Sequence, residues 1–491
     1  MSQTVAHPRN TALLIGLLCA GVFLTALDQT IVVTALPSMM LDLQIQVRDL
    51  DQASWIVTGY LLGYTVALPL LGRVADAYGY ARIFLLAMLV FIAASVAIPL
   101  MPSLPSLVAA RVVQALGGGA IVPIAFSLAT FTVPWQRRAL VLGLVAAMAE
   151  AGAVLGPLYG GLIVEHLSWR WIFWLNIPLG LLIALPVFLQ TPRASRPGVR
   201  VDYAGGLVLG LTIAGLLLAL RLNGETLVLD AETLAWGGAT LAALGALILW
   251  ERRARDPLVP AALLRWRPFL AAGSTHFLVG AALIVALVNV PLMANTIMGQ
   301  SPLEGGLRLL RLTVFIPPGA LLGGLLARRA GYRLPAILGL LAAAGGFSLL
   351  MGWQIDVAEP ELTLHLALTG LGFGLVIPPL ATAMLDSARE EERGIAASLF
   401  VLTRMLGMMV GLAAITAWGI SSFRSTVAGL PLPLPLPGET AAELEQRLLQ
   451  YQSQLNQAIL GIFRHMFLAG LALCLAALLP TFWLGRPRDQ G

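Results

Sequence analysis

The chain alternates between long apolar segments and short polar joints along almost all of its 491 residues. A transmembrane helix needs about 20 consecutive, mostly apolar residues, and windows of about 19 residues predict fourteen of them. They lie near residues 11–36, 52–72, 81–100, 105–131, 139–164, 170–190, 202–222, 231–250, 268–297, 305–327, 333–353, 363–386, 394–421 and 459–484. We therefore predict an all-α integral membrane protein with fourteen transmembrane helices.

The composition supports this prediction and excludes several kinds of chemistry. Hydrophobic residues make up 58% of the chain and charged residues 11%, whereas soluble domains have about 25% charged residues. All 30 basic residues are arginine, so the chain lacks the lysine of a phosphate-binding loop and of a Schiff-base enzyme. Cys19 and Cys474 lie in apolar segments, where we expect packing roles. We predict no enzyme activity, no cofactor and no metal site.

The arginines also predict the topology. If the N-terminus is cytoplasmic, twenty arginines fall in cytoplasmic segments and five on the opposite side. This bias follows the positive-inside rule and predicts a multi-pass protein of the bacterial inner (plasma) membrane with both termini in the cytoplasm. The net charge of +5 is dispersed through loops rather than gathered in a basic tail, so we expect no nucleic-acid partner.

Two short patterns occur twice at almost the same spacing. Gly72–Tyr80 is similar to Gly324–Tyr332, and Leu116–Gly119 is similar to Leu371–Gly374. Transporters are often built from duplicated halves. We therefore predict parallel repeats, divided into an N-terminal six-helix bundle at 1–192, two inserted helices with linkers at 193–257, and a C-terminal six-helix bundle at 258–491.

Five motifs carry a resemblance to a known family: Ala26–Pro37, Trp55–Leu62, Gly72–Arg82, Arg111–Gln114 and Gly152–Gly161. Together they resemble the major facilitator superfamily, specifically its fourteen-span drug:proton antiporter branch and the mycobacterial triacylglycerol and multidrug exporter subgroup. The resemblance implies the major facilitator fold and transport by alternating access. Departures occur at Ala77, Tyr80 and Ala81, which replace basic loop positions, and at Ala115, which replaces a glycine.

Among the charged residues within predicted membrane spans, three stand out: Asp28, Glu150 and Arg404. Each costs at least about 2.5 kcal/mol near the bilayer centre, which suggests a function. A static pair in which Arg404 neutralises one carboxylate is one interpretation. We favour the other, in which a carboxylate titrates, and the resemblance implies that all three are coupling residues. We predict Glu150 or Asp28 as the carrier of the coupling proton, with Arg404 as its partner.

Arg111 and the signature loop are candidates for a relay or gate. The resemblance gives Arg111 a role in proton relay or gate stabilisation, while the alternative is snorkelling to the outer interface. Asp76 stands where it can accept N–H groups of a helix N-terminus and pair with a nearby arginine. We predict that it latches the cytoplasmic gate, in a loop that also keeps Arg82.

A glycine-rich motif lies in the fifth predicted span: Gly152, Gly156, Pro157, Gly160 and Gly161. Small residues allow close helix contact and proline removes a helix hydrogen bond. The resemblance implies a hinge or a seal against proton leak, and plain helix packing is the alternative. His276, Asn289 and Asn295 fall in the ninth span, where we expect hydrogen bonds within the bundle more than a proton role.

An extension precedes the last span, at about 422–458. Leu430–Gly438 alternates leucine and proline and predicts a stiff extended turn, after which Thr440 and Glu443 have the spacing of a capping box. A helix from there to residue 484 would be about 67 Å long at about 1.5 Å per residue. We predict that it projects outward and shields a lipid chain, although it could instead lie on the outer leaflet.

These observations predict a proton-coupled antiporter that exports hydrophobic or amphiphilic substrates, either lipids such as triacylglycerides or drugs. Protons would be the coupling ion, and membrane lipids would surround a monomer. One alternative is an uncoupled lipid flippase or scramblase. Another is a membrane scaffold that presents the outer extension to a periplasmic lipoprotein.

Overall fold

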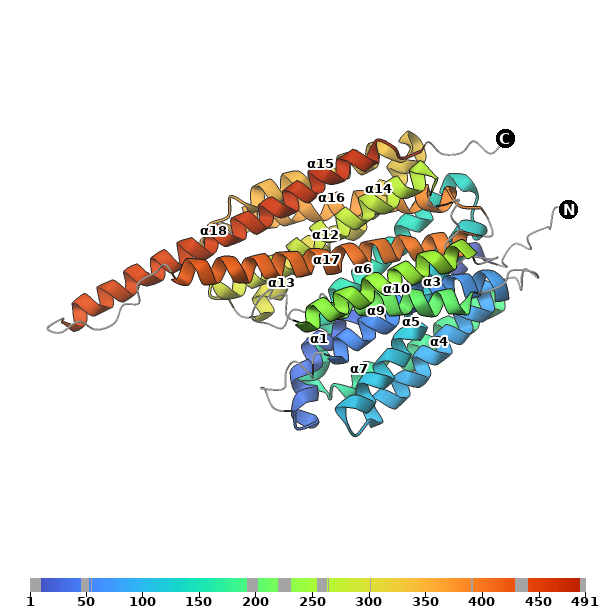
Figure 1. Ribbon diagram of the computed structural model, residues 1–491, viewed down its shortest axis with the longest axis horizontal. Helices are drawn as coiled ribbons and strands as arrows, with labels where there is room; N and C mark the ends of the chain where they lie inside the picture. The colour runs from blue at the N-terminus through green and yellow to red at the C-terminus, as the bar shows by residue number, and fades with distance from the viewer. Residues whose placement is uncertain are drawn as a thin grey trace.

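The computed structural model describes residues 10–45, 53, 55–191, 202–219, 231–253, 263, 265–300, 302–389, 392–428 and 440–485. Within these ranges all regular elements are helices (Figure 1). The mostly apolar helices satisfy their own backbone hydrogen bonds, which is what a bilayer requires. The fold class predicted from the sequence, all-α and membrane-spanning, is therefore confirmed.

The helices of the first half form one group. Their bounds are α1 (Thr11–Asp42), α3 (Trp55–Tyr78), α4 (Tyr80–Ala97), the short 3₁₀ helix η2 (Ile98–Leu100), α5 (Leu104–Thr132), α6 (Trp135–His166), α7 (Arg170–Trp174) and α8 (Asn176–Gln190). In this group α1 packs along α6, α5 lies between α3 and α4, and α8 covers α4.

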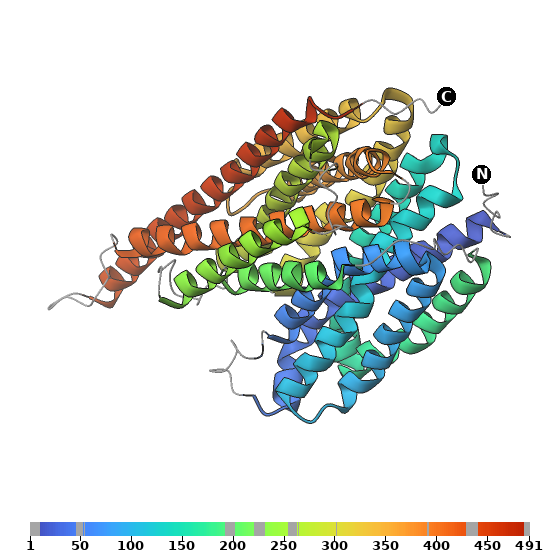
Figure 2. The same cartoon turned by 45° about the vertical axis from the view of Figure 1, so that its right-hand side comes forward.

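The second half repeats this arrangement after two intervening helices, α9 (Tyr203–Ala219) and α10 (Ala231–Arg253). Its helices are α12 (Arg267–Thr296), α13 (Pro302–Thr313), α14 (Ile316–Ala330), α15 (Arg333–Leu350), α16 (Glu359–Asp386), α17 (Arg393–Ala428) and α18 (Ala441–Thr481). Here α12 packs along α17, and α16 lies between α14 and α15. Figure 2 shows the two groups on opposite sides of the molecule, and α9 packs on α3.

Twelve described helices are long and apolar enough to cross a membrane. A thirteenth candidate is α3, which bends by 43° between Leu68 and Leu70, where Pro69 has no backbone N–H to donate. The apolar part of α9, Tyr203–Leu216, is shorter than a span. Helices therefore occur at all fourteen predicted positions, but the number of complete spans is not established as fourteen.

Two predicted spans are each built from two consecutive helices and still count as single apolar spans, Glu304–Ala330 and Arg170–Gln190. The segment at 305–327 is divided between α13 and α14, because Pro317 and Pro318 at the start of α14 cannot donate backbone hydrogen bonds to a preceding turn. The segment at 170–190 is divided into α7 and α8 at Leu175.

The internal repeat is visible in glycine contacts. Gly79 and Gly331 end equivalent helices with positive φ, 96° and 75°, a conformation that glycine adopts without strain. On α5, Gly117 lies against Ala87 of α4 and Gly119 against Tyr64 of α3.

The corresponding glycines of α16 make the corresponding contacts. Gly372 lies against Ala343 of α15 and Gly374 against Ile316 of α14. The two halves thus use the same packing at the same place. The domain boundaries near 192 and 257 fall at residues outside the described ranges, so that division stays a prediction.

The longest helix, α18, extends beyond its neighbours (Figure 1). Its 41 residues span about 60 Å at about 1.5 Å per residue, twice a hydrocarbon core of about 30 Å. The predicted capping box is confirmed, because Thr440 and Glu443 bond each other's backbone N–H groups. The predicted Leu430–Gly438 turn lies outside the described residues.

Candidate functional site

The centre of the molecule contains an ion pair between its two halves. Glu150 lies near the middle of α6 and Arg404 in the first third of α17, and their side chains form a salt bridge. Only 9% of the Glu150 side chain and 15% of the Arg404 side chain are exposed. Arg404 was predicted to pair with one of the two buried carboxylates, and its partner is Glu150.

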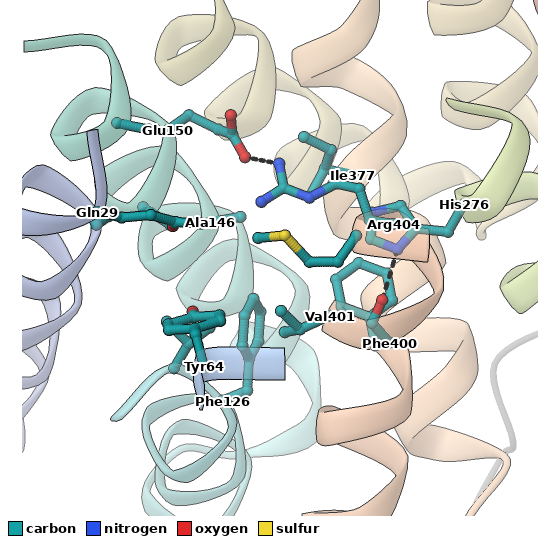
Figure 3. A pocket seen from close by; sticks show the side chains of 15 residues that line it. Gln29, Tyr64, Phe126, Ala146, Glu150, His276, Ile377, Phe400, Val401 and Arg404 are labelled. Carbon is teal, nitrogen blue, oxygen red and sulfur yellow. Dashed lines mark hydrogen bonds and ion pairs between the residues drawn. The ribbon is translucent and has the colours of Figure 1, made fainter. Parts of the chain in front are cut away.

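This pair lines a cavity between the halves (Figure 3). About 490 Å³ of atom-free space, open solvent included, lies at this site, and ten of its fifteen lining residues are apolar. The polar lining residues are Gln29, Tyr64, Glu150, His276 and Arg404. Such a wall offers apolar contact to most of a ligand and confines polar recognition to a few points.

A second buried pair lies within the first half. Asp28 of α1 accepts a hydrogen bond of 2.8 Å from Arg111 of α5, and both side chains are almost completely buried, at 1% and 0% exposure. Gln114 and Asn176 donate to the other oxygen of Asp28 at 3.2 and 2.7 Å. Gln114 also donates to Ser95 at 2.8 Å. The carboxylate is therefore held by one charge and two amides.

Aromatic rings complete the surroundings of Arg111. Its guanidinium lies 4.1 Å from the centre of the Tyr60 ring and 5.6 Å from that of Phe173, within the range of cation–π attraction. The side chain is buried in the bundle, so the interpretation that it snorkels to the outer interface was wrong.

The structure therefore separates residues that the sequence analysis grouped together. Asp28 pairs with Arg111, not with Arg404. No role was predicted from the sequence for Gln114, Asn176 or Ser95. The spacing of Arg111 and Gln114 places both on one face of a helix. This spacing could have identified Gln114 as a neighbour of the Arg111 site. Ser95 and Asn176 carry no such signal.

The glycine-rich motif of α6 packs against α1. Gly152, Gly156 and Gly160 lie one turn apart, and a Cβ at each would come within 3 Å of α1. Thr30 of α1 donates to the carbonyl oxygen of Ala153 at 2.8 Å. Gly161 has open space beside it, and nothing is described for the side chain of Pro157. Three of the five motif residues thus allow a close helix contact directly next to Glu150.

Asp76 lies near the end of α3, where this helix of the first half contacts the start of α17 in the second half. Both chain ends lie at one end of the molecule, called the terminal end below (Figure 2). The Oδ1 of Asp76 accepts the backbone N–H of Gly394 at 3.2 Å, in the first turn of α17, and also the Tyr80 hydroxyl. A carboxylate is stabilised at a helix N-terminus, as predicted for this residue. Close by, Gly72 of α3 touches Gly394 directly.

A second contact between the halves lies at the same end. Asp386 at the end of α16 accepts a hydrogen bond of 2.5 Å from the Tyr332 hydroxyl and lies 3.8 Å from Arg138 of α6. Burial, together with the Asp386 carboxylate, raises the pKa of Tyr332. These residues were not predicted from the sequence, and Arg82, which was predicted, is exposed on α4.

At the opposite end, a polar cluster ties α1 to α7. Asp42 accepts a hydrogen bond of 2.7 Å from the Trp169 indole and forms an ion pair with Arg170. Arg170 also donates to the carbonyl oxygen of Pro99 at 3.2 Å. The hydrogen bonds from Trp169 and Arg170 lower the pKa of Asp42.

The polar residues of α12 have separate surroundings. Asn289 is buried and donates to the carbonyl oxygen of Val285 in its own helix at 2.8 Å. Asn295 lies against Gly305 of α13. His276 is 1% exposed and lies at the cavity beside Arg404 (Figure 3).

Two groups of membrane-spanning helices, with a cavity and the Glu150–Arg404 pair between them, have the architecture of a multi-pass membrane transporter. Residues 18–412 match the Major Facilitator Superfamily, and the chain belongs to this family.

Among curated proteins, the chain is 37% identical to a triacylglyceride transporter of Mycolicibacterium smegmatis over 95% of this chain and 86% of the relative. It is 35% identical to a triacylglyceride transporter of Mycobacterium tuberculosis over 92% and 90%.

Solved structures show the same fold. The human organic anion transporter MFSD10 has a TM-score of 0.61 at 16% identity, covering 97% of this chain and 99% of that one. The proton:xylose symporter XylE has a TM-score of 0.61 at 13% identity, covering 97% and 96%.

Proposed function

We propose that this transporter is a proton-coupled antiporter that exports hydrophobic or amphiphilic molecules by alternating access. The observation that carries the proposal is the Glu150–Arg404 ion pair, which joins the two halves at the wall of the central cavity. A proton on Glu150 would remove the charge that attracts Arg404. The charge state of one carboxylate would then bias the relative position of the halves, which is what coupling requires.

The two buried pairs would have different parts in this mechanism. Glu150 lies at the cavity and between the halves, so its protonation would affect both ligand binding and conformation. Asp28 is enclosed within the first half by Arg111, Gln114 and Asn176. We therefore assign the coupling proton to Glu150, and to the Asp28 network a supporting role as relay and as a rigid anchor beneath the cavity.

The cavity wall supports a hydrophobic substrate. Its apolar residues suit acyl chains or amphiphilic drugs, and its few polar groups offer little recognition of sugars or nucleotides. Curated relatives carry the name triacylglyceride transporter. We propose lipids such as triacylglycerides as the first substrates to test, with drugs as the second.

The arginine bias supports a fourteen-span topology in the bacterial plasma membrane with both termini in the cytoplasm. The terminal end, where Asp76 contacts Gly394 and Arg138 faces Asp386, would then be the cytoplasmic gate in a closed state. The projecting part of α18 would lie outside, where it could shield an acyl chain or contact a periplasmic lipoprotein. We propose that a monomer carries out transport.

The test is uptake into inverted vesicles that contain the full-length protein, with and without an imposed pH gradient. The probes are a fluorescent triacylglyceride and ethidium, and the variant is Glu150→Gln. Glu165→Gln is the matched control, because Glu165 is an exposed carboxylate on the same helix.

Gradient-dependent uptake that is lost in Glu150→Gln and kept in Glu165→Gln would support antiport, and the probe that moves would name the substrate class. Equal equilibration of lipid in all proteins, with or without the gradient, would instead indicate a scramblase. Absence of transport with retained binding of an outer lipoprotein would indicate a scaffold.

A further inference from the structure

His276 is a buried polar residue of the cavity that the proposed coupling mechanism does not use. Its ring stacks on Phe400, with centroids 3.8 Å apart and planes within 6°. Its Nδ1 lies 2.9 Å from the Phe400 carbonyl oxygen. Stacking and hydrogen bond together fix the orientation of the ring at the cavity wall (Figure 3).

The hydrogen bond determines which nitrogen carries the proton. A carbonyl oxygen can only accept a hydrogen bond, so Nδ1 must be the donor. In a neutral imidazole the other nitrogen, Nε2, is then an acceptor. No atom of the described part of the chain bonds to Nε2, which is buried. An unpaired acceptor of this kind is costly to bury.

Among the described residues the His276 ring has no counterion of its own. His276 is 1% exposed and lines the same cavity as Arg404, whose counterion Glu150 is already engaged in the salt bridge. A buried cation without its own partner is strongly destabilising. The ring therefore presents a lone pair, and not a second N–H, to an incoming ligand.

We propose that Nε2 of His276 is a recognition point for a hydroxyl group on a hydrophobic substrate. The inference rests on the proposed function, and it narrows the substrate class. A triacylglyceride has only acceptor oxygens and cannot satisfy Nε2, whereas an acylglycerol with a free hydroxyl or an amphiphilic phenol can donate to it. The cavity then binds the hydroxyl end of the molecule, and the apolar wall contacts the remainder.

The experiment is equilibrium binding to the purified full-length protein in detergent, without a pH gradient, by isothermal titration calorimetry. One pair of probes is dioctanoylglycerol and its O-methyl ether, and a second is octylphenol and octylanisole. Members of a pair differ only in the hydroxyl hydrogen and one methyl group. The two pairs separate a glycerolipid from a phenol as the source of the hydroxyl.

Three variants isolate the acceptor. His276→Phe keeps the ring that stacks on Phe400 but has no nitrogen, and His276→Asn keeps a donor near the Nδ1 position but ends before Nε2. Asn289→Ala is the control, because Asn289 is a buried amide of the same helix that does not line the cavity.

We expect the wild type and Asn289→Ala to bind at least one hydroxyl probe about fivefold tighter than its ether, in keeping with one net hydrogen bond. His276→Phe and His276→Asn should bind both members of that pair with the affinity that the wild type has for the ether.

Equal affinities in the wild type for both pairs would overturn the inference even if no variant folds, and so would a hydroxyl preference that survives in His276→Asn. Because binding is measured without a gradient, these outcomes do not depend on proton coupling. Failure of antiport in vesicles with a retained hydroxyl preference would refute the proposed function alone.

Discussion

Arg404 and Glu150 form an ion pair although 254 residues separate them in the chain. The pair crosses from one half of the transporter to the other, whereas Asp28 and Arg111 pair within the first half. The two interactions are alike in chemistry but differ in what their loss would do. Loss of the first changes how the halves attract each other, and loss of the second changes the stability of one half.

The first prediction concerns proton coupling. Glu150→Gln should reduce gradient-driven transport at least about tenfold, because losing even ~1.4 kcal/mol of charge interaction changes an equilibrium by that factor. Uptake into inverted vesicles measures it, with Glu165→Gln unchanged. Full gradient-driven activity in Glu150→Gln would show that the coupling proton binds elsewhere.

The second prediction concerns the stability of the first half. Asp28→Asn leaves the completely buried Arg111 without a counterion, and breaking a buried pair costs about 3–5 kcal/mol. We expect a clear decrease in the Tm of the purified protein. Glu150→Gln should lower the Tm less, since Arg404 remains partly exposed. A larger decrease for Glu150→Gln than for Asp28→Asn would contradict the distinction between the two pairs.

The third prediction concerns the gate at the terminal end. Asp76→Asn weakens a charged hydrogen bond to the N-terminus of α17, and such bonds are worth about 1.5–3 kcal/mol. A cysteine introduced at Ser398, which is buried against Gly72, should then react faster with a water-soluble thiol reagent.

The native cysteines, Cys19 and Cys474, are buried free thiols and provide the background rate. Asp356→Asn serves as the control, because Asp356 is exposed in the structure. Unchanged labelling at Ser398→Cys in the Asp76→Asn background would argue against a latch.

The fourth prediction concerns pH at the opposite end. The Trp169 indole and Arg170 lower the pKa of Asp42 below its ordinary value of 3.8. A lowered folded-state pKa stabilises the fold at pH values above 3.8, and this stabilisation is lost as the pH falls through the folded-state pKa. Asp42→Asn should lower the Tm at neutral pH. The difference in Tm between this variant and the wild type should be smaller at acid pH. A difference that grows in acid would reverse the predicted sign.

The fifth prediction concerns the projecting helices. Deletion of residues 425–455 should reduce export of a long-chain lipid more than export of ethidium, since only the lipid has acyl chains to shield from water. The same vesicle assay measures both. An equal reduction for both probes would indicate a general folding role for this segment.

The helices, their approximate bounds and the family could be predicted from the amino-acid sequence. Apolar runs, the capping box at Thr440 and the repeated turns at Gly79 and Gly331 are local signals, and the energies behind them arise within one helix or one turn. Hydropathy averaged over a window placed the spans at 170–190 and 305–327, but it does not register a single interrupted turn, such as those at Leu175 and between α13 and α14.

The partners of the buried charges, by contrast, depend on how the helices pack. A helical sequence shows which face a residue occupies, but not which distant helix will cover that face. Asp28, Glu150 and Arg404 were therefore identifiable as costly buried groups, whereas the burial of Arg111 and the division of the four charges into two pairs were not. The orientation of His276 depends on the backbone carbonyl of Phe400, 124 residues away. Every residue has a backbone carbonyl, so the sequence does not show which one accepts this hydrogen bond.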